Sequence, residues 1–270
     1  MVGNYAKYLK EQIDGKSPSI GVVLGSGLNC ISNSLNNKAV IPYSEIPSFQ
    51  NTSVEGHPGE FIVGDITNSE KSAIFANGRF HLYEGLAYNN TYMIIDIFKE
   101  IGCQAVIITN SSGCLDDSWA PGDLMIIDSH IDFTFRGSYE VEDKKSGNAY
   151  YNAYLTNLAE SEMINNNIAY HFGTYGWTMG PTYETESEIK MMRNHHIKAV
   201  GMSTVPEINR AHELKLPLLA IACLTNYAVG ISKNPLTHEE VVQEAEKAAN
   251  KFANVILSII KKIKLPAINL

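Results

Sequence analysis

Ile20-Gly21-Val22-Val23-Leu24 is a short run of mostly β-branched residues, and Gly25-Ser26-Gly27 follows it directly. The run predicts a buried strand, and the glycines behind it predict a tight turn in which backbone amides can approach an anion. Similar short apolar runs recur at 72–76, 104–109, 123–127 and 217–224. We expect each of them to be a strand.

Helical patterns lie between or after these runs, at 91–101, at 205–214 and at roughly 238–262. Thr185 with Glu188, and Thr237 with Glu240, have the spacing of capping boxes. Helices between buried strands predict an α/β fold in a single domain over residues 1–270. Its mixed, largely parallel central sheet should carry helices on both faces.

The composition narrows the class of protein. A net charge of -8 argues against a nucleic-acid groove, and 44% hydrophobic residues can form a substantial core. None of the four cysteines lies in a CxxC pair, which argues against a zinc site and favours free thiols in a reducing compartment. With no signal-peptide pattern and no apolar run of about 18 residues, we expect a cytoplasmic protein without a membrane segment.

A dense polar motif follows the run at 72–76. In an extended chain Arg79, His81 and Tyr83 would point to one face, because side chains alternate along a strand. Arginine has the geometry to bind an oxyanion with two hydrogen bonds. The alternative is a salt-bridged arginine beside a core tyrosine.

Three glycine-containing or small-residue segments are weaker signals, namely Gly25-Ser26-Gly27, Gly56-His57-Pro58-Gly59 and Thr109-Asn110-Ser111-Ser112-Gly113. Each could place donors beside an anion, and each could equally be a plain turn. The first lacks the GxGxxG pattern because Cys30 stands at the third glycine position, which argues against a nicotinamide-binding protein.

Two further segments place an aromatic ring, a carboxylate, a thioether and a hydroxyl near two helix starts. They are Gly180-Pro181-Thr182-Tyr183-Glu184-Thr185 and Gly201-Met202-Ser203-Thr204-Val205-Pro206-Glu207. Such a set could hold a flat heterocycle beside an anion. Asn226, which ends the run at 217–224, can both donate to a ring nitrogen and accept from one. Taken alone, Asn226 could be a turn former and His238 a surface residue.

In order along the chain these segments resemble the trimeric purine nucleoside phosphorylases. The resemblance covers roughly residues 20–260, with 131–170 poorly matched. It rests on eight motifs: Gly25 to Leu28, Gly56 to Gly59, Gly78 to Gly85, Thr109 to Gly113, Gly180 to Thr185, Gly201 to Glu207, Thr225-Asn226 and His238 to Val241.

The resemblance implies a role for each motif residue. The residues implied for phosphate are Ser26, His57, Arg79, His81, Ser203 and the backbone amide of Ser111. The residues implied for the nucleoside are Tyr83, Met202 and His238 at the ribose, and Tyr183, Glu184 and Asn226 at the base. Asn226, Glu184 and His81 are expected to carry catalysis. The resemblance also implies a homotrimer.

The implied reaction is reversible phosphorolysis of a purine (deoxy)ribonucleoside to the free base and (deoxy)ribose 1-phosphate. Phosphate is a co-substrate, and we expect neither a cofactor nor a metal. Asn226 would donate to N7 of the leaving purine, and Glu184 would accept the N1–H of a 6-oxopurine. We therefore expect inosine and guanosine to be preferred over adenosine, with xanthosine left open.

Two departures from the family pattern affect these expectations. Tyr227 stands where many members have Lys or a small apolar residue, which could alter the base pocket. The aromatic residue that the family lends to a neighbouring subunit should lie in the poorly matched segment, with Phe133, Phe135 and Tyr139 as candidates. The alternative functions are a methylthioadenosine phosphorylase and a nucleoside-binding protein without turnover. The sister methylthioadenosine phosphorylases typically carry Ser and Asp where this chain has Glu184 and Asn226.

Overall fold

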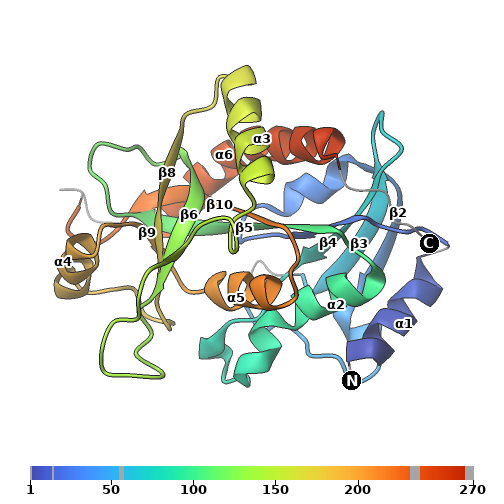
Figure 1. The fold of residues 1–270 in the computed structure, drawn as a ribbon, viewed down its shortest axis with the longest axis horizontal. Coiled ribbons are helices and arrows are strands. Elements are labelled where there is room, and N and C mark those ends of the chain that lie inside the picture. The colour runs from blue at the N-terminus through green and yellow to red at the C-terminus, as the bar shows by residue number, and fades with distance from the viewer. Residues whose placement is uncertain (1, 14, 55–57, 232–237, 265–270) are drawn as a thin grey trace.

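A computed structural model describes residues 2–13, 15–54, 58–231 and 238–264 (Figure 1). The strands are β1 (Ile20–Val23), β2 (Leu35–Pro42), β3 (Glu60–Ile66), β4 (Ser72–Asn77), β5 (Ala105–Cys114), β6 (Leu124–Asp132), β7 (Lys145–Ser146), β8 (Tyr170–Trp177), β9 (Ile197–Gly201) and β10 (Leu218–Tyr227). The helices are α1 (Val2–Gln12), α2 (Met93–Ile101), α3 (Ala153–Asn165), α4 (Glu186–Asn194), α5 (Val205–Glu213) and α6 (His238–Lys262).

The strands form one mixed sheet in the order β10-β6-β8-β9-β5-β1-β4-β3-β2, with β7 paired to β6. β10 also pairs with β5, so β5, β10, β6, β8 and β9 close into a ring. The predicted α/β fold with a mixed sheet is confirmed. Parallel pairings join β4, β1, β5 and β10, and the edge strands β2 and β3 are antiparallel.

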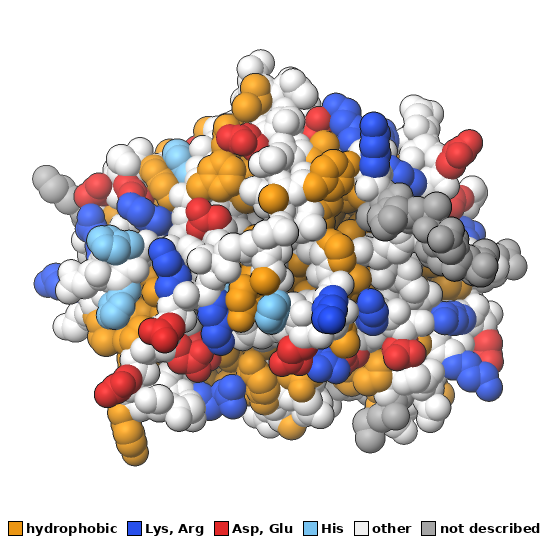
Figure 2. Space-filling model, in the orientation of Figure 1, with side chains coloured by type: hydrophobic (Ala, Val, Ile, Leu, Met, Phe, Trp, Pro, Cys, Tyr) orange, Lys and Arg blue, Asp and Glu red, His pale blue; other side chains and the backbone are white. Residues whose placement is uncertain are grey.

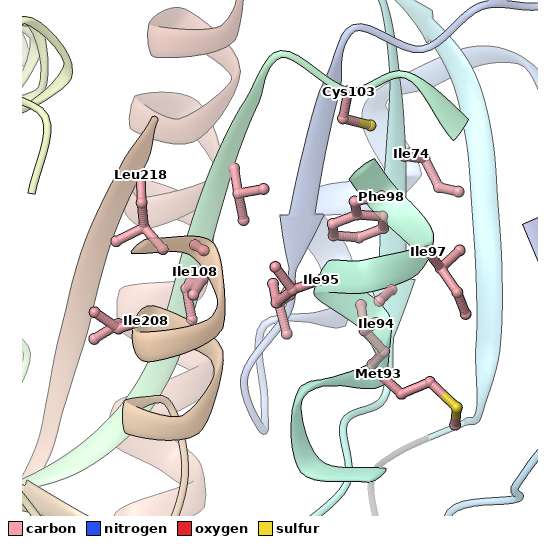
Figure 3. Close-up of a cluster of buried hydrophobic side chains, with 14 of the residues drawn as sticks. Ile74, Met93, Ile94, Ile95, Ile97, Phe98, Cys103, Ile108, Ile208 and Leu218 are labelled. Atoms are coloured by element: carbon pink, nitrogen blue, oxygen red, sulfur yellow. The ribbon is translucent and has the colours of Figure 1, made fainter. Parts of the chain in front are cut away.

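Helices cover both faces of the sheet, as predicted. One core cluster packs α1, α2 and α5 against it, and a second packs α3 and α6 on the opposite side (Figure 1). In the first cluster Ile95 of α2 points toward the strand that carries Ile108, and Phe98 packs over Gly21 of β1 (Figure 3). A Cβ at Gly21 would collide with the Phe98 ring, so this position in β1 requires a glycine.

All the predicted strands and helices exist, and the main differences are at their ends. β5 and β10 continue to Cys114 and Tyr227, beyond the apolar runs that predicted them. α5 begins with Pro206 in its first turn, and Gly102 ends α2 with a positive φ of 111°. The Thr185–Glu188 capping box is confirmed, whereas Thr237 lies outside the described residues.

Acidic and basic side chains are interspersed over the face of the molecule seen in Figure 2. Within the described ranges, no helix combines the length and the apolar character needed to cross a membrane. In the same part of the chain, no group of three or more His, Cys, Asp or Glu side chains is arranged to hold a metal ion.

Candidate active site

The candidate residues gather where strands end. β4, β1, β5 and β10 run parallel, so their carboxyl ends lie along one edge of the sheet. β9 meets β5 only through the carboxyl-terminal residues of both strands, with Val200 opposite Gly113. β8 runs parallel to β9, with Trp177 opposite Gly201. The ring of strands therefore brings the carboxyl ends of β5, β8, β9 and β10 together, where α/β folds commonly bind ligands.

The turn after β1 packs directly onto the end of β5. The Gly25 amide donates to Thr109 Oγ1 at 3.1 Å, and Ser111 Oγ donates to the Ser26 carbonyl at 2.7 Å. A Cβ at Gly25 would lie 2.6 Å from the Asn110 Cα, so the close approach needs glycine. Ser26 and Ser111, both predicted from the sequence to bind phosphate, are thus brought together.

Arg79 follows β4 and is almost completely buried, with 1% of its surface exposed. Its Nη1 donates to Ser203 Oγ at 2.9 Å and to Thr204 Oγ1 at 3.1 Å, and its Nη2 lies 3.4 Å from Glu207 Oε2. Burial raises the pKa of Glu207, while the Arg79 guanidinium lowers it. Arg79 is therefore an ion-paired arginine that also lies beside Ser203, and its role in binding phosphate stays a prediction.

Thr204 connects Arg79 to β5. Asn110 Nδ2 donates to Thr204 Oγ1 at 2.8 Å, and Ser112 Oγ donates to Asn110 Oδ1 at 2.6 Å. Thr204 has a φ of 80°, which is strained for a β-branched residue. Such strain, about 1–3 kcal/mol, persists where surrounding contacts hold the residue in place. Sequence reasoning missed Thr204 as a partner of Arg79 and Asn110 as a partner of Thr204.

His81 is anchored by Glu84. Glu84 Oε1 accepts a hydrogen bond from the His81 amide at 2.7 Å and lies 3.2 Å from His81 Nδ1. Ser53 donates to Glu84 Oε2 through its amide at 3.0 Å and its hydroxyl at 2.7 Å. Burial raises the pKa of Glu84, but the hydrogen bonds from His81 and Ser53 outweigh it and hold the pKa at about 2. A charged carboxylate on Nδ1 fixes the orientation of the imidazole, whose own pKa is lowered by burial.

The chain does not stay extended through Tyr83, so the alternation of side chains considered from the sequence does not apply. β4 ends at Asn77, and Leu82–Glu84 form a 3₁₀ turn that stops at Gly85 with a φ of 75°. The turn exists because Glu84 bonds back to the His81 backbone. His81 and Tyr83 nevertheless remain neighbours, since their rings stack with centroids 4.8 Å apart.

The 180–184 segment approaches Tyr83 and Met202. Gly180 has a φ of 70°, and a Cβ there would lie 2.5 Å from Met202 Sδ and 2.9 Å from Tyr83 Cδ1. Three segments that are far apart in sequence thus meet at Gly180. Tyr183 is 56% exposed, so its ring is open to a ligand or to another chain.

Glu184 and Asn226 are both held by neighbouring threonines. Thr178 Oγ1 donates to Glu184 Oε1 at 2.8 Å, and Thr225 Oγ1 donates to Asn226 Oδ1 at 2.9 Å. The Thr178 amide donates to the Gly201 carbonyl, next to the Val200–Gly113 pair, and Gly113 pairs with Asn226 on its other side. Thr178, which holds Glu184, and Asn226 therefore lie at the same end of the ring of strands. Sequence reasoning identified neither threonine as a partner.

Tyr227 does not extend beside Asn226. Its hydroxyl donates to the Trp119 carbonyl at 2.7 Å, and its ring packs against the core cluster that contains α2 and α5. Successive side chains of a strand point to opposite faces, so the Tyr227 phenol is directed away from the Asn226 carboxamide.

Two of the predicted residues cannot be placed. His57 lies outside the described residues, and so does the side chain of His238, the first residue of α6. Three aromatic residues were candidates for the one lent to a neighbouring subunit. Of these, Phe133 is only 5% exposed and packs inside its own chain. Phe135 is 42% exposed and Tyr139 is fully exposed, so these two can reach another subunit.

Comparison with known proteins agrees with this geometry. Residues 19–261 match the family model described as the phosphorylase superfamily. Purine nucleoside phosphorylase 1 of Geobacillus stearothermophilus is 35% identical over 266 residues, covering 96% of both chains, and the Bos taurus enzyme is 29% identical, covering 96% of this chain and 93% of its own. The crystal structure of Schistosoma mansoni purine nucleoside phosphorylase with inosine superimposes with a TM-score of 0.87 at 30% identity. It covers 98% of this chain and 97% of its own.

A crystal structure of Schistosoma mansoni purine nucleoside phosphorylase with adenosine has a TM-score of 0.86 at 28% identity, covering 98% of both chains. Family match, relatives and structural neighbours thus coincide over nearly the whole chain. The chain belongs to the purine nucleoside phosphorylases of the phosphorylase superfamily.

Proposed function

We propose that this purine nucleoside phosphorylase cleaves 6-oxopurine nucleosides, with inorganic phosphate as co-substrate and no cofactor. The products are the free base and (deoxy)ribose 1-phosphate. The observation that carries the proposal is the arrangement of two groups at the carboxyl ends of the strands. Arg79, His81 and Ser203 form the proposed phosphate-binding cluster. It lies at the same end of the sheet as the Glu184 carboxylate and the Asn226 carboxamide.

Phosphate is already an anion, so the site does not need a base to activate it. Arg79 supplies the charge, and the Ser203 hydroxyl beside it supplies a further donor. Ser26, the Ser111 amide and His81 complete the proposed phosphate site, with His57 assigned by family resemblance alone. The work of these groups is to position phosphate beneath the sugar and to stabilise charge.

The ribosyl group develops oxocarbenium character as the glycosidic bond breaks, and phosphate attacks it with inversion. Tyr83 and Met202 are the proposed ribose contacts, together with His238 by resemblance. The leaving purine gains negative charge, and Asn226 donates to its N7. Thr225 donates to Asn226 Oδ1, and Nδ2 donates one hydrogen to the Tyr227 carbonyl at 3.0 Å, so the second Nδ2 hydrogen is the one proposed to reach N7.

Glu184 is the proposed basis of specificity, and Tyr183 is the proposed aromatic beside the base. A carboxylate accepts the N1–H of hypoxanthine or guanine, whereas N1 of adenine carries a lone pair and would be repelled. Leaving a buried polar group unpaired can reject an analogue by about 10⁴-fold. The Schistosoma neighbour was solved with adenosine as well as with inosine, so adenosine is the competitor that must be measured.

The test is a phosphate-dependent assay of inosine, guanosine, xanthosine, adenosine and methylthioadenosine. We expect phosphate-dependent release of hypoxanthine and guanine with a higher kcat/KM than release of adenine. A clear preference for methylthioadenosine or adenosine would overturn the role of Glu184. Nucleoside binding without any phosphate-dependent product would favour the alternative of a non-catalytic binding protein. Arg79→Ala should raise the KM for phosphate more than the KM for inosine.

A further inference from the structure

The residue that holds Glu184 in place is Thr178. The backbone of Thr178 is fixed, because its amide donates to the Gly201 carbonyl at 3.0 Å and the preceding Trp177 carbonyl accepts from the Phe133 amide at 2.8 Å. Trp177 itself is buried, with 1% of its surface exposed. The Thr178 hydroxyl therefore projects from a rigid position at the end of β8.

Glu184, in contrast, follows a surface segment. Met179, Pro181, Thr182 and Tyr183, which lead from Thr178 to Glu184, are all exposed. Behind Glu184, the capping box of Thr185 and Glu188 fixes the backbone at the start of α4, but it does not fix the Glu184 side chain. Within the described part of the chain, the hydrogen bond from Thr178 Oγ1, at 2.8 Å, is the contact that fixes the position of the carboxylate.

We propose that Thr178 is a specificity-determining residue: its hydroxyl donates to Glu184 Oε1 and thereby directs the carboxylate toward the purine N1 edge. The inference rests on the proposed use of Glu184 to recognise a 6-oxopurine. Thr178 does not touch the base in this scheme and acts through Glu184 as a positioning residue.

The direction of the effect follows from hydrogen-bond chemistry. The hydrogen bond from Thr178 Oγ1 restricts the Glu184 carboxylate to one position, from which it can accept from the purine N1–H. An ionised carboxylate accepts from the N1–H of hypoxanthine or guanine, whereas only a protonated one could donate to N1 of adenine. Loss of the hydroxyl should therefore lower kcat/KM for inosine, which uses the Glu184 contact, more than kcat/KM for adenosine.

The experiment compares wild type with Thr178→Val, which keeps the side-chain shape and removes the donor, and with Thr178→Ser, which keeps the donor. Each is assayed with inosine and adenosine at saturating phosphate. For Thr178→Val we expect the ratio of kcat/KM for inosine to that for adenosine to fall by about tenfold, the scale of one hydrogen bond to a charged group. The change should lie mainly in the KM for inosine, because the N1–H contact exists in both ground and transition states.

Thr178→Ser should restore the wild-type ratio. Thr182→Val, in the same exposed segment, is the matched control and should leave the ratio and the melting temperature unchanged. If Thr178→Val is poorly folded, Thr178→Ala replaces it as the donor-free variant.

The inference would be overturned, and the proposed function left intact, by either of two results. In one, the donor-free variant has the same ratio as wild type; in the other, the ratio for Thr178→Ser is as low as that for Thr178→Val. A wild-type protein that does not release hypoxanthine from inosine with phosphate would instead overturn the proposed function, and this inference with it.

Discussion

At the scale of single residues, the side chains proposed to act on substrate are oriented by other side chains behind them. Arg79 and Asn110 share Thr204, Glu84 holds His81, and Thr225 holds Asn226. Each partner limits the rotamers of the group it binds. The site is therefore organised before substrate arrives, which is the condition for electrostatic stabilisation without reorganisation.

Asn226→Ala tests this preorganisation in the part of the site that is proposed to bind the purine base. Removing one preorganised donor to the leaving group should lower kcat for inosine by about 10²-fold or more. The KM for phosphate should change little, because the substitution does not alter the proposed phosphate-binding cluster around Arg79. Steady-state kinetics with both substrates varied will measure the two effects, and an unchanged kcat would exclude Asn226 from catalysis.

At the scale of elements, β6 and α5 are joined by a buried histidine. His130 of β6 is 1% exposed, with its Nδ1 2.7 Å from the Tyr151 hydroxyl and its Nε2 3.1 Å from Asn209 Oδ1 of α5. Burial lowers the pKa of His130 to about 4, with the Asn209 contact opposing the shift. The contact between β6 and α5 through His130 therefore requires the neutral imidazole.

The sign of the resulting pH dependence follows from linkage. Below an unfolded-state pKa of about 6.5 the unfolded chain binds a proton that the folded chain excludes. The contribution of His130 is thus fully present above pH 6.5 and is lost as the pH falls toward 4. The loss should be about 3 kcal/mol in the free energy of unfolding.

Denaturant unfolding of wild type and His130→Gln between pH 7 and pH 4.5 will measure this effect. Glutamine can still hydrogen-bond but does not titrate in this range. The variant should be the less stable protein at pH 7, and the gap should narrow as the pH falls. A gap that stays constant across this range would show that His130 does not carry the dependence.

At the scale of the whole molecule, the pairing of β10 with β5 makes the site, because it turns part of an open sheet into a ring. Gly113 then has Val200 on one side and Asn226 on the other. Within the described ranges, the proposed base pocket is left without a cover on the side of the exposed Tyr183. We propose, as the family resemblance implies, a homotrimer in which a neighbouring subunit supplies that cover.

Phe135 is the better candidate for the lent aromatic. It follows β6 with a φ of 52° and is 42% exposed, whereas Phe133 is buried in its own chain. Phe135→Ala should raise the KM for inosine by roughly tenfold, on the scale of one stacking contact. Tyr139→Ala, nearby and fully exposed, is the matched control and should have a smaller effect.

Co-expression tests whether the contact crosses between subunits. A Phe135→Ala chain retains Asn226, and an Asn226→Ala chain retains Phe135, so mixed trimers contain some sites with both residues. Their activity should exceed the sum of the two variants assayed separately. The proposal of a residue lent between subunits would be contradicted if the protein sedimented at the mass of a single chain. It would also be contradicted if mixed trimers were no more active than the two variants assayed separately.

The sequence by itself determined the buried strands and the local motifs. The runs at 20–24, 72–76 and 217–224 became β1, β4 and β10, because strands covered on both faces form continuous apolar segments. The Thr185–Glu188 box depends on residues three apart and was equally predictable. The order of the motifs was enough to identify the family. The prediction of one domain over 1–270 stays a prediction.

Only the tertiary structure decided the edge strands, the ring and the supporting contacts. β2, with Asn36, Asn37 and Lys38 exposed, and β8, with two glycines, lack the apolar runs that would have predicted them. Thr204 binds Arg79 across 125 positions, and Asn110 binds Thr204 across 94. Hydrogen bonds between distant segments leave no periodic pattern in the chain. They form when the sheet closes and brings strand ends within reach, and so they become visible only in the folded protein.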